Sequence, residues 1–202
     1  MKYQKLIVGD LQTNCYLVWN EDSRKVVIID PADESDFISD EIQRLDLIPE
    51  AIWLTHGHFD HVLAALDLKL IFNIPIIGSK LDSFLIDRTT KTANYFGSKV
   101  NIPEFNIDKE TIDSDEFEIM RIPGHTPGSI GFYTKKENLL FSGDVIFRDG
   151  VGRTDFSYGN AKELNESIEK IKKLPEDTLI CPGHGEEFVI GQMDDYYSLD
   201  SL

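Results

Sequence analysis

The chain has 202 residues, of which 41% are hydrophobic and 28% charged, and its formal net charge at pH 7 is −16. The length suits one globular domain with a buried core, and no run approaches the ~20 apolar residues that cross a bilayer. The balance of 36 acidic against 20 basic residues disfavours a nucleic-acid partner, because such binding depends on Lys and Arg contacts to phosphates.

We therefore expect a single domain over 1–202, with a short acidic tail from about residue 191 and no membrane association. No charged-then-apolar signal peptide precedes the first predicted strand. The two cysteines, Cys15 and Cys181, lie in apolar runs without zinc or redox spacing. These features predict reduced core thiols and a cytoplasmic location.

The first third of the chain mixes strand and helix patterns. Apolar runs predict strands over 3–8, 13–19, 25–29 and 51–54. Helical periodicity predicts a helix over 34–46, whose apolar stripe is Phe37, Ile38, Ile42 and Leu45. A second helix is expected over 60–72, with five inward-facing residues: Val62, Leu63, Leu66, Leu70 and Ile71.

The rest of the chain is richer in strands. A short strand is expected at 75–77, and residues 80–98 are ambiguous between helix and loop. Further strands are expected over 116–122, 129–134, 138–142 and 178–181. An amphipathic helix is expected over 160–174, where Pro175 ends it.

Histidine and aspartate side chains, which commonly bind metals, follow four of these strands. The strand at 51–54 leads into His56, His58, Asp60 and His61, which fall within six residues. His125 and His184 lie on Gly/Pro-rich turns, and Asp144 follows the strand at 138–142. All five histidines of the chain are in these places. Imidazole and carboxylate groups are ligands of zinc and other divalent metals, so the pattern predicts a metal site at the strand ends.

These residues, in this order, resemble the metallo-β-lactamase fold superfamily. The motifs are His-x-His-x-Asp-His at 56–61, Gly-His-Thr-Pro-Gly at 124–128, Ser-Gly-Asp at 142–144 and Pro-Gly-His-Gly at 182–185. Within that superfamily the chain is most similar to small, single-domain glyoxalase II-like hydrolases. The resemblance implies an α/β (α+β) fold, the four-layer αββα sandwich.

The resemblance also implies a dinuclear metal site. It assigns His56, His58 and His125 to one ion, assigns Asp60, His61 and His184 to the second, and makes Asp144 the bridge. Asp60 and Asp144 would then act in catalysis with a metal-bridging hydroxide. Two divalent ions are expected, with zinc first and iron or manganese also compatible with nitrogen and oxygen donors. Asp30 would support the site without binding metal.

The activity implied is thioester hydrolysis of the S-lactoylglutathione type, with a small-molecule thioester or related acyl substrate. Candidate substrate contacts are Arg153, Tyr95 and Lys91, although an arginine that only fixes loop carbonyls explains Arg153 at least as well and surface lysines are usually only solvated. Full-length glyoxalase II has a further C-terminal helical domain with basic contacts to glutathione. This chain ends soon after His184, so recognition of glutathione stays open.

Several alternatives to this activity remain. One is a mononuclear-iron oxidoreductase similar to the persulfide dioxygenases of the superfamily. Another is promiscuous β-lactamase or ribonuclease activity, and a third is a metal-binding protein without turnover. The sequence leaves the natural substrate, the metal and the oligomeric state open.

Overall fold

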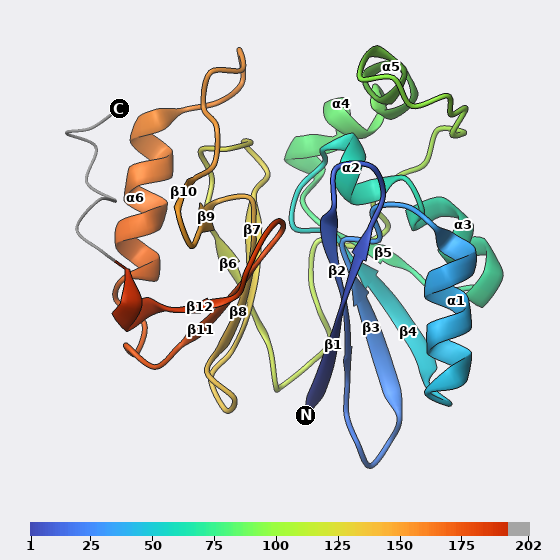
Figure 1. The fold of residues 1–202 in the computed structure, drawn as a ribbon, viewed down its shortest axis with the longest axis horizontal. Coiled ribbons are helices and arrows are strands. Elements are labelled where there is room, and N and C mark those ends of the chain that lie inside the picture. The colour runs from blue at the N-terminus through green and yellow to red at the C-terminus, as the bar shows by residue number, and fades with distance from the viewer. Residues whose placement is uncertain (194–202) are drawn as a thin grey trace. The chain divides into compact units, whose positions relative to one another are not determined.

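The structure is a computed structural model, and it describes residues 1–193. The chain divides into two compact units, Met1–Thr111 and the part that begins at Ile112, and each contains a five-stranded sheet (Figure 1). The expected acidic tail falls mostly on 194–202, outside the described residues. Among residues 1–193, no helix combines the length and the apolar content that a bilayer crossing requires.

The sheet of the first unit has the strand order β1-β2-β3-β4-β5. β1, β2 and β3 pair antiparallel, whereas β3, β4 and β5 pair parallel. The strands are β1 (Lys2–Val8), β2 (Thr13–Trp19), β3 (Lys25–Ile29), β4 (Ile48–Trp53) and β5 (Ile76–Ile77). Parallel pairing aligns Ile29 with Trp53, so the segments that follow β3 and β4 leave the sheet at the same edge. Ligand sites commonly form at this edge of parallel strands.

Helix α1 (Ser35–Arg44) covers one side of this sheet. Ile38 and Ile42, one helical turn apart, belong to the same buried apolar cluster as strand residues such as Ile28. Phe37 is 42% exposed, so the prediction that it belongs to the buried stripe is wrong. It lies 100° around the helix from Ile38, at the edge of the face that the sheet covers.

Residues 60–72 form two helices rather than the single helix that the sequence predicts. Helix α2 (Phe59–Val62) ends before Leu63, and α3 (Ala65–Phe72) begins after Ala64. The backbone N–H of Ala64 donates to the carbonyl oxygen of Pro31 at 3.0 Å. Because this N–H is used outside the helix, the ladder of i to i−4 hydrogen bonds is interrupted there.

The interruption changes the face that α3 buries. Ala65 and Leu68 are buried, whereas Leu70 and Ile71 are 70% and 53% exposed. The prediction that Leu70 and Ile71 face inward is therefore wrong, because it assumed one continuous helical phase from residue 60.

The segment after β5 is largely helical, which resolves the ambiguity of residues 80–98. It contains a 3₁₀ turn, η1 (Lys80–Asp82), followed by α4 (Ser83–Ile86) and α5 (Thr89–Tyr95). Ala93 of α5 packs with Phe59 and Leu63, so this segment is attached to the chain around α2.

The sheet of the second unit has the order β12-β11-β8-β7-β6, in which β8 and β11 pair parallel and the other neighbours antiparallel. Its strands are β6 (Glu118–Arg121), β7 (Ile130–Thr134), β8 (Leu139–Gly143), β11 (Leu179–Pro182) and β12 (Phe188–Val189). A separate pair joins β9 (Ile146–Phe147) to β10 (Gly150–Val151). A second 3₁₀ turn, η2 (Ile190–Gln192), follows β12.

Helix α6 (Ala161–Ile171) packs on this sheet (Figure 1). Asn160 caps it, because the Asn160 side-chain oxygen accepts the backbone N–H groups of Lys162 and Glu163. Leu164 and Ile168 lie in one apolar cluster with strand residues such as Leu140. The helix thus confirms the amphipathic pattern predicted over 160–174.

Candidate metal centre

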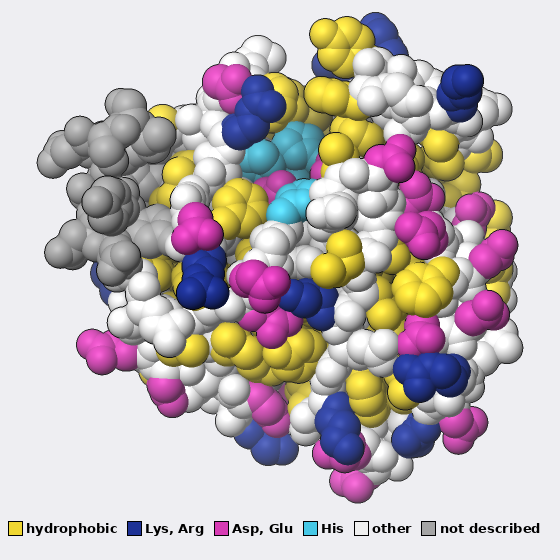
Figure 2. Space-filling view, in the orientation of Figure 1, with side chains coloured by type: hydrophobic (Ala, Val, Ile, Leu, Met, Phe, Trp, Pro, Cys, Tyr) yellow, Lys and Arg dark blue, Asp and Glu magenta, His cyan; other side chains and the backbone are white. Residues whose placement is uncertain are grey.

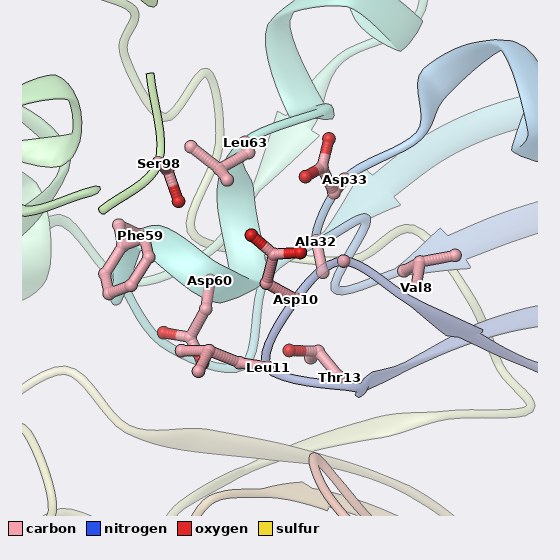
Figure 3. Close-up of a pocket in the computed structure, with 11 residues that line it drawn as sticks. Val8, Asp10, Leu11, Thr13, Ala32, Asp33, Phe59, Asp60, Leu63 and Ser98 are labelled. Carbon is pink, nitrogen blue, oxygen red and sulfur yellow. The ribbon is translucent and has the colours of Figure 1, made fainter. Parts of the chain in front are cut away.

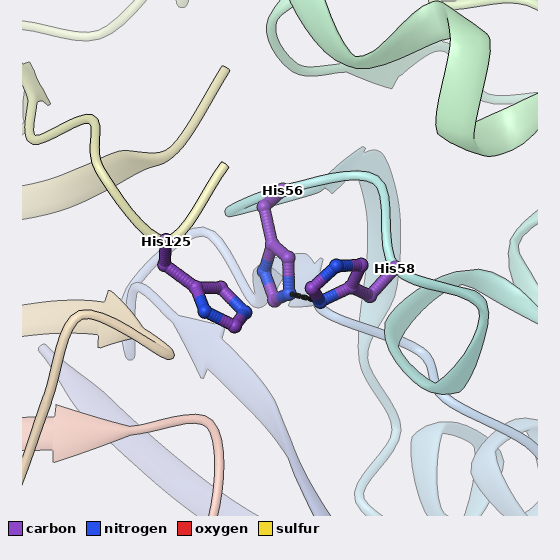
Figure 4. Close-up of side chains that lie close together, drawn as sticks. All are labelled: His56, His58 and His125. Carbon is purple, nitrogen blue, oxygen red and sulfur yellow. Dashed lines mark hydrogen bonds between the residues drawn. The ribbon is translucent and has the colours of Figure 1, made fainter. Parts of the chain in front are cut away.

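The histidine-rich segment of the first unit follows β4 directly. The backbone N–H of Leu54 still pairs with Ile77 in the neighbouring strand, and the chain then turns before α2. In this turn the Nε2 atom of His56 lies 3.0 Å from the Nδ1 atom of His58, as the dashed line in Figure 4 marks. His56 is 3% exposed, whereas His58 is only half-buried. Two ring nitrogens that face each other at this distance can hold one proton or one cation between them.

A hydrogen-bond chain behind His56 determines which of its nitrogens carries the proton. The hydroxyl of Thr55 donates to Oδ2 of Asp30 at 2.6 Å and lies 3.0 Å from Nδ1 of His56. Since the hydroxyl proton is used on Asp30, Thr55 accepts from the Nδ1–H of His56. In the neutral ring the Nε2 atom of His56 then carries the lone pair that a metal needs.

Asp30 positions His61 in the same way. Oδ2 of Asp30 accepts from Nδ1 of His61 at 3.0 Å, and Oδ1 accepts the backbone N–H of Thr55 at 2.7 Å. His61 is fully buried, and its Nε2 atom lies 3.7 Å from Oδ2 of Asp60. Asp30 could itself join His56 and His61 around an ion. Its two oxygens already accept three hydrogen bonds, however, so the geometry favours the supporting role predicted for it.

The second unit presents His125 on the turn before β7. Its Nδ1 atom donates to the backbone carbonyl of Arg153 at 2.8 Å, and its Nε2 atom lies 3.8 Å from Oδ2 of Asp144. A carbonyl can only accept, so the lone pair of the neutral His125 ring is again on Nε2. The contact requires Gly152 next to Arg153, because a Cβ at Gly152 would lie 1.9 Å from the carbonyl oxygen of Asp144.

Asp144 and His184 meet because the strands before them are parallel neighbours. Phe141 of β8 pairs with Cys181 of β11, and the N–H of Gly183 donates to the carbonyl of Gly143 at 2.9 Å. Asp144 directly follows Gly143 and His184 directly follows Gly183, so both side chains leave the same edge. The Nε2 atom of His184 lies 3.6 Å from Oδ2 of Asp144.

The donor geometry in each unit fits divalent metal ions. Two ligand atoms that each lie about 2.1 Å from a tetrahedral ion are about 3.4 Å apart. The donor pairs of the two units span 3.0 to 3.8 Å: His56 with His58, Asp60 with His61, Asp144 with His125 and Asp144 with His184. Three of the histidines also have Nδ1 held by an oxygen, which is the usual outer support of a metal-binding imidazole: His56, His61 and His125.

The candidate substrate residues lie at the surface. Lys91 and Tyr95 are on α5, and Tyr95 is 85% exposed. The guanidinium of Arg153 makes two hydrogen bonds to Asp155, at 2.9 and 2.7 Å, and stands 4.6 Å over the ring of Phe156. Hydrogen bonding to Asp155 raises the pKa of Arg153 above its ordinary value. The guanidinium of Arg153 is thus held within its own loop by side chains, an acid and an aromatic ring.

A small pocket opens beside Asp60 within the first unit (Figure 3). Phe59 and Leu63 line it together with Leu11, and Asp10 and Asp33 contribute two further carboxylates. The ring of Phe59 stacks on Phe96 with centroids 5.5 Å apart. Histidine side chains also reach the surface on the face that Figure 2 shows. Asp60 and part of the histidine set are thus accessible from solvent.

Sequence reasoning missed two residues that hold the histidine segment. Thr55 links Asp30 to His56, and Asp82 accepts the backbone N–H of Gly57 at 2.9 Å. Thr55 could have been suspected from its place next to His56. Asp82 carries no signal in the sequence, because it lies 25 residues beyond Gly57 in a segment without a motif.

Comparisons with known proteins identify the family of this chain. A family model described as the metallo-β-lactamase superfamily matches residues 8–184. A hydroxyacylglutathione hydrolase (GloC) of Haemophilus influenzae is 40% identical over 201 residues, which cover 95% of this chain and 94% of that protein. A hydroxyacylglutathione hydrolase of Wigglesworthia glossinidia brevipalpis is 37% identical over 84% of this chain but only 60% of its own length.

Solved structures match over nearly the whole chain. The protein TTHA1623, solved in a di-iron-bound form, has a TM-score of 0.87 at 34% identity and covers 94% of this chain and 96% of its own. The BLEG-1 B3 metallo-β-lactamase has a TM-score of 0.85 at 33% identity and covers 95% of each chain. These likenesses confirm the predicted fold class, a mixed α/β fold with two sheets and helices. The chain belongs to the metallo-β-lactamase superfamily, and it is a metal-binding hydrolase of the glyoxalase II-like type.

Proposed function

We propose that this protein hydrolyses small hydroxyacyl thioesters with a pair of divalent metal ions. The proposal assigns His56, His58 and His125 to one ion and Asp60, His61 and His184 to the other, with Asp144 between them. The observation that carries it is the donor geometry within each unit. The Nε2 atoms of His61, His125 and His184 lie 3.7, 3.8 and 3.6 Å from a carboxylate oxygen of Asp60 or Asp144.

Residues outside the proposed ligand set orient the histidine rings of such a site. Asp30 holds His61 directly and holds His56 through Thr55, so both rings offer Nε2. The carbonyl of Arg153 does the same for His125. When bound, a metal pair lowers the pKa of a water molecule from about 15.7 to near 7 and polarises a carbonyl oxygen. The protein then needs no side-chain nucleophile of its own.

The choice of a thioester rests on the relatives. A relative that matches over 94% of its own length is a hydroxyacylglutathione hydrolase, so an acyl thioester is the first substrate class to test. The chain spans 60% of the Wigglesworthia hydrolase. Recognition of the glutathione part is therefore a separate question from cleavage of the thioester bond.

β-Lactam hydrolysis is the second candidate. The likeness to the BLEG-1 B3 metallo-β-lactamase extends over 95% of both chains and supports this candidate. Both reactions begin with attack on an acyl carbonyl, so the same donor set suits either substrate. Zinc and iron are both candidate metals, since TTHA1623 was solved with two irons. The cytoplasmic location, the small-molecule partner and the substrate contacts of Lys91, Tyr95 and Arg153 stay proposals.

The proposed function is tested by loading metal-free protein separately with zinc, iron and manganese. Metal content is measured per chain, and turnover is measured with S-lactoylglutathione, a neutral N-acetylcysteamine thioester, a cephalosporin and a glutathione persulfide. We expect two ions per chain and metal-dependent release of thiol from at least one thioester. His58→Ala and Asp144→Ala should abolish that release. A protein with two ions that cleaves the cephalosporin and no thioester would replace the first candidate with the second.

A further inference from the structure

Asp82 is a buried carboxylate that contacts the histidine segment from outside the metal-type motifs. It is 1% exposed, and its Oδ2 atom accepts the backbone N–H of Gly57 at 2.9 Å. Gly57 is itself buried and lies between His56 and His58. Asp82 comes from the end of η1, 25 residues further along the chain.

The position of Asp82 favours a role outside its own helix. It precedes the first residue of α4, where an aspartate ordinarily caps the helix by accepting N–H groups from the first turn. The Asp82 side chain makes no such capping hydrogen bond. Its carboxylate is instead directed to the peptide of Gly57.

The approach of the two segments is close enough to require glycine. A Cβ atom at Gly57 would lie 2.8 Å from Cβ of Asp82 and 2.9 Å from its carbonyl oxygen. Such distances force one segment to move, because real Cβ atoms do not approach neighbours so closely. The glycine therefore allows the hydrogen bond that Asp82 makes.

Two buried aspartates hold alternate peptides of this segment. Asp30 accepts the N–H of Thr55 at 2.7 Å, and Asp82 accepts the N–H of Gly57 at 2.9 Å. The residue between these two peptides is His56, and the one after them is His58. The two anchors thus set the backbone from which both rings project, and these rings bring Nε2 of His56 to 3.0 Å from Nδ1 of His58.

We propose that Asp82 is a positioning residue for the metal site, which acts by fixing the Gly57 peptide so that His56 and His58 converge on one ion. The inference rests on the proposed assignment of these histidines as ligands. Asp82 itself does not bind the ion. Its role is the acceptance of one N–H, and its negative charge is secondary.

Three variants distinguish the loss of the hydrogen-bond acceptor, the loss of the negative charge and a general loss of stability. Asp82→Ala removes the acceptor, whereas Asp82→Asn removes the charge but keeps an oxygen that can accept the Gly57 N–H. The matched control is Asp108→Ala, because Asp108 accepts the backbone N–H of Ile76 at 2.7 Å in the same unit, away from the histidines in the chain. Each protein is stripped of metal and titrated with Co²⁺ against a chromophoric chelator. The Co²⁺ absorption spectrum and the melting temperature of the metal-free protein are recorded as well.

Asp82→Ala should bind Co²⁺ about 10- to 100-fold more weakly than the wild type and change the Co²⁺ spectrum, as expected when a support of metal ligands is lost. Asp82→Asn should restore most of the affinity and the wild-type spectrum. Asp108→Ala should lower the melting temperature without either change. If Asp82→Ala does not fold, a weakened affinity in Asp82→Asn would still contradict the positioning role, since it would make the charge decisive.

Two further results would overturn the inference. In one, Asp82→Ala binds Co²⁺ as tightly as the wild type, which would leave the proposed function intact. In the other, Asp108→Ala and Asp82→Ala lower the melting temperature equally and also weaken Co²⁺ binding equally. A wild-type protein that binds no Co²⁺ or Zn²⁺ would overturn both this inference and the metal assignment, so the two failures are distinguishable.

Discussion

The buried carboxylate of Asp30 accepts a hydrogen bond from Nδ1 of His61 at 3.0 Å. Asp30 lies at the end of β3 in the left-handed region, with φ 48°, which turns its side chain toward the segment that follows β4. Aspartate tolerates this conformation better than most residues. The carboxylate therefore reaches both Thr55 and His61, and it determines which ring nitrogen of His61 is available.

Asp30→Asn is predicted to weaken metal binding without changing any proposed ligand. The amide offers one acceptor oxygen in place of two, and its NH₂ group can only donate. Where that NH₂ faces His61, the ring must accept on Nδ1 and carry its proton on Nε2, which then cannot bind an ion. We expect zinc affinity to fall about 10- to 100-fold, as measured by chelator competition. Unchanged zinc affinity would show that Asp30 does not control which nitrogen of His61 carries the proton.

Thr55→Val is predicted to destabilise the protein and disturb His56. Valine has nearly the same shape, but it leaves Oδ2 of Asp30 and Nδ1 of His56 without the hydroxyl that joins them. Loss of a buried hydrogen-bond partner costs about 1–3 kcal/mol, which urea unfolding of the metal-free protein can measure. Thr55→Ser keeps the hydroxyl and serves as the control. A Thr55→Val protein as stable as the wild type, or one more stable than Thr55→Ser, would contradict the role of the hydroxyl.

Gly152→Ala should be strongly destabilising, whereas Gly150→Ala should not. A Cβ at Gly152 would lie 1.9 Å from the carbonyl oxygen of Asp144 and 3.2 Å from Cβ of His125, and one at Gly150 would meet nothing within 4 Å. The clash must displace the backbone of the turn and costs about 1–3 kcal/mol or more. Thermal unfolding of the two variants gives the comparison. Similar melting temperatures would mean that the turn around Gly152 adapts without cost.

Asp108 should make stability depend on pH in the acid range. Burial pushes the pKa of Asp108 up, but the hydrogen bonds from Lys69 and from the Ile76 N–H together outweigh it and lower the pKa below 3.8. Because the folded pKa lies below the unfolded one, Asp108 contributes stability above pH 3.8, and this contribution is lost as the pH falls through the folded value. The difference in unfolding free energy between the wild type and Asp108→Asn should therefore shrink below about pH 4. Urea unfolding at pH 6 and at pH 3 measures it, and a constant difference would contradict the assignment.

The strand and helix patterns predicted most of the fold, because long apolar runs and amphipathic repeats reflect burial directly. The short strands β9, β10 and β12 escaped prediction, since each has two residues and shows no periodicity. The break at Ala64 escaped for a different reason. It depends on Pro31, a residue more than 30 positions earlier in the sequence, whose carbonyl accepts the Ala64 N–H.

The burial of the cysteines agrees with the sequence prediction. Cys15 and Cys181 are buried and form no disulfide among the described residues. Burial, reinforced by the negative charge of Asp30, raises the pKa of the Cys15 thiol far above its ordinary value. The thiol is therefore kept in its neutral form, as expected of a core residue.

For the candidate site, the sequence by itself was sufficient to propose a set of donor side chains, because imidazole and carboxylate groups at successive strand ends have few other uses. Tertiary structure decided which nitrogen His56 and His61 offer and what holds their segment in place. Those properties depend on the Asp30 contacts with Thr55 and His61 and on the Asp82 contact with Gly57. Each of these hydrogen bonds joins residues 25 or more positions apart. Local sequence patterns cannot predict such contacts. The contacts form only when parallel strands and packed turns bring distant residues together.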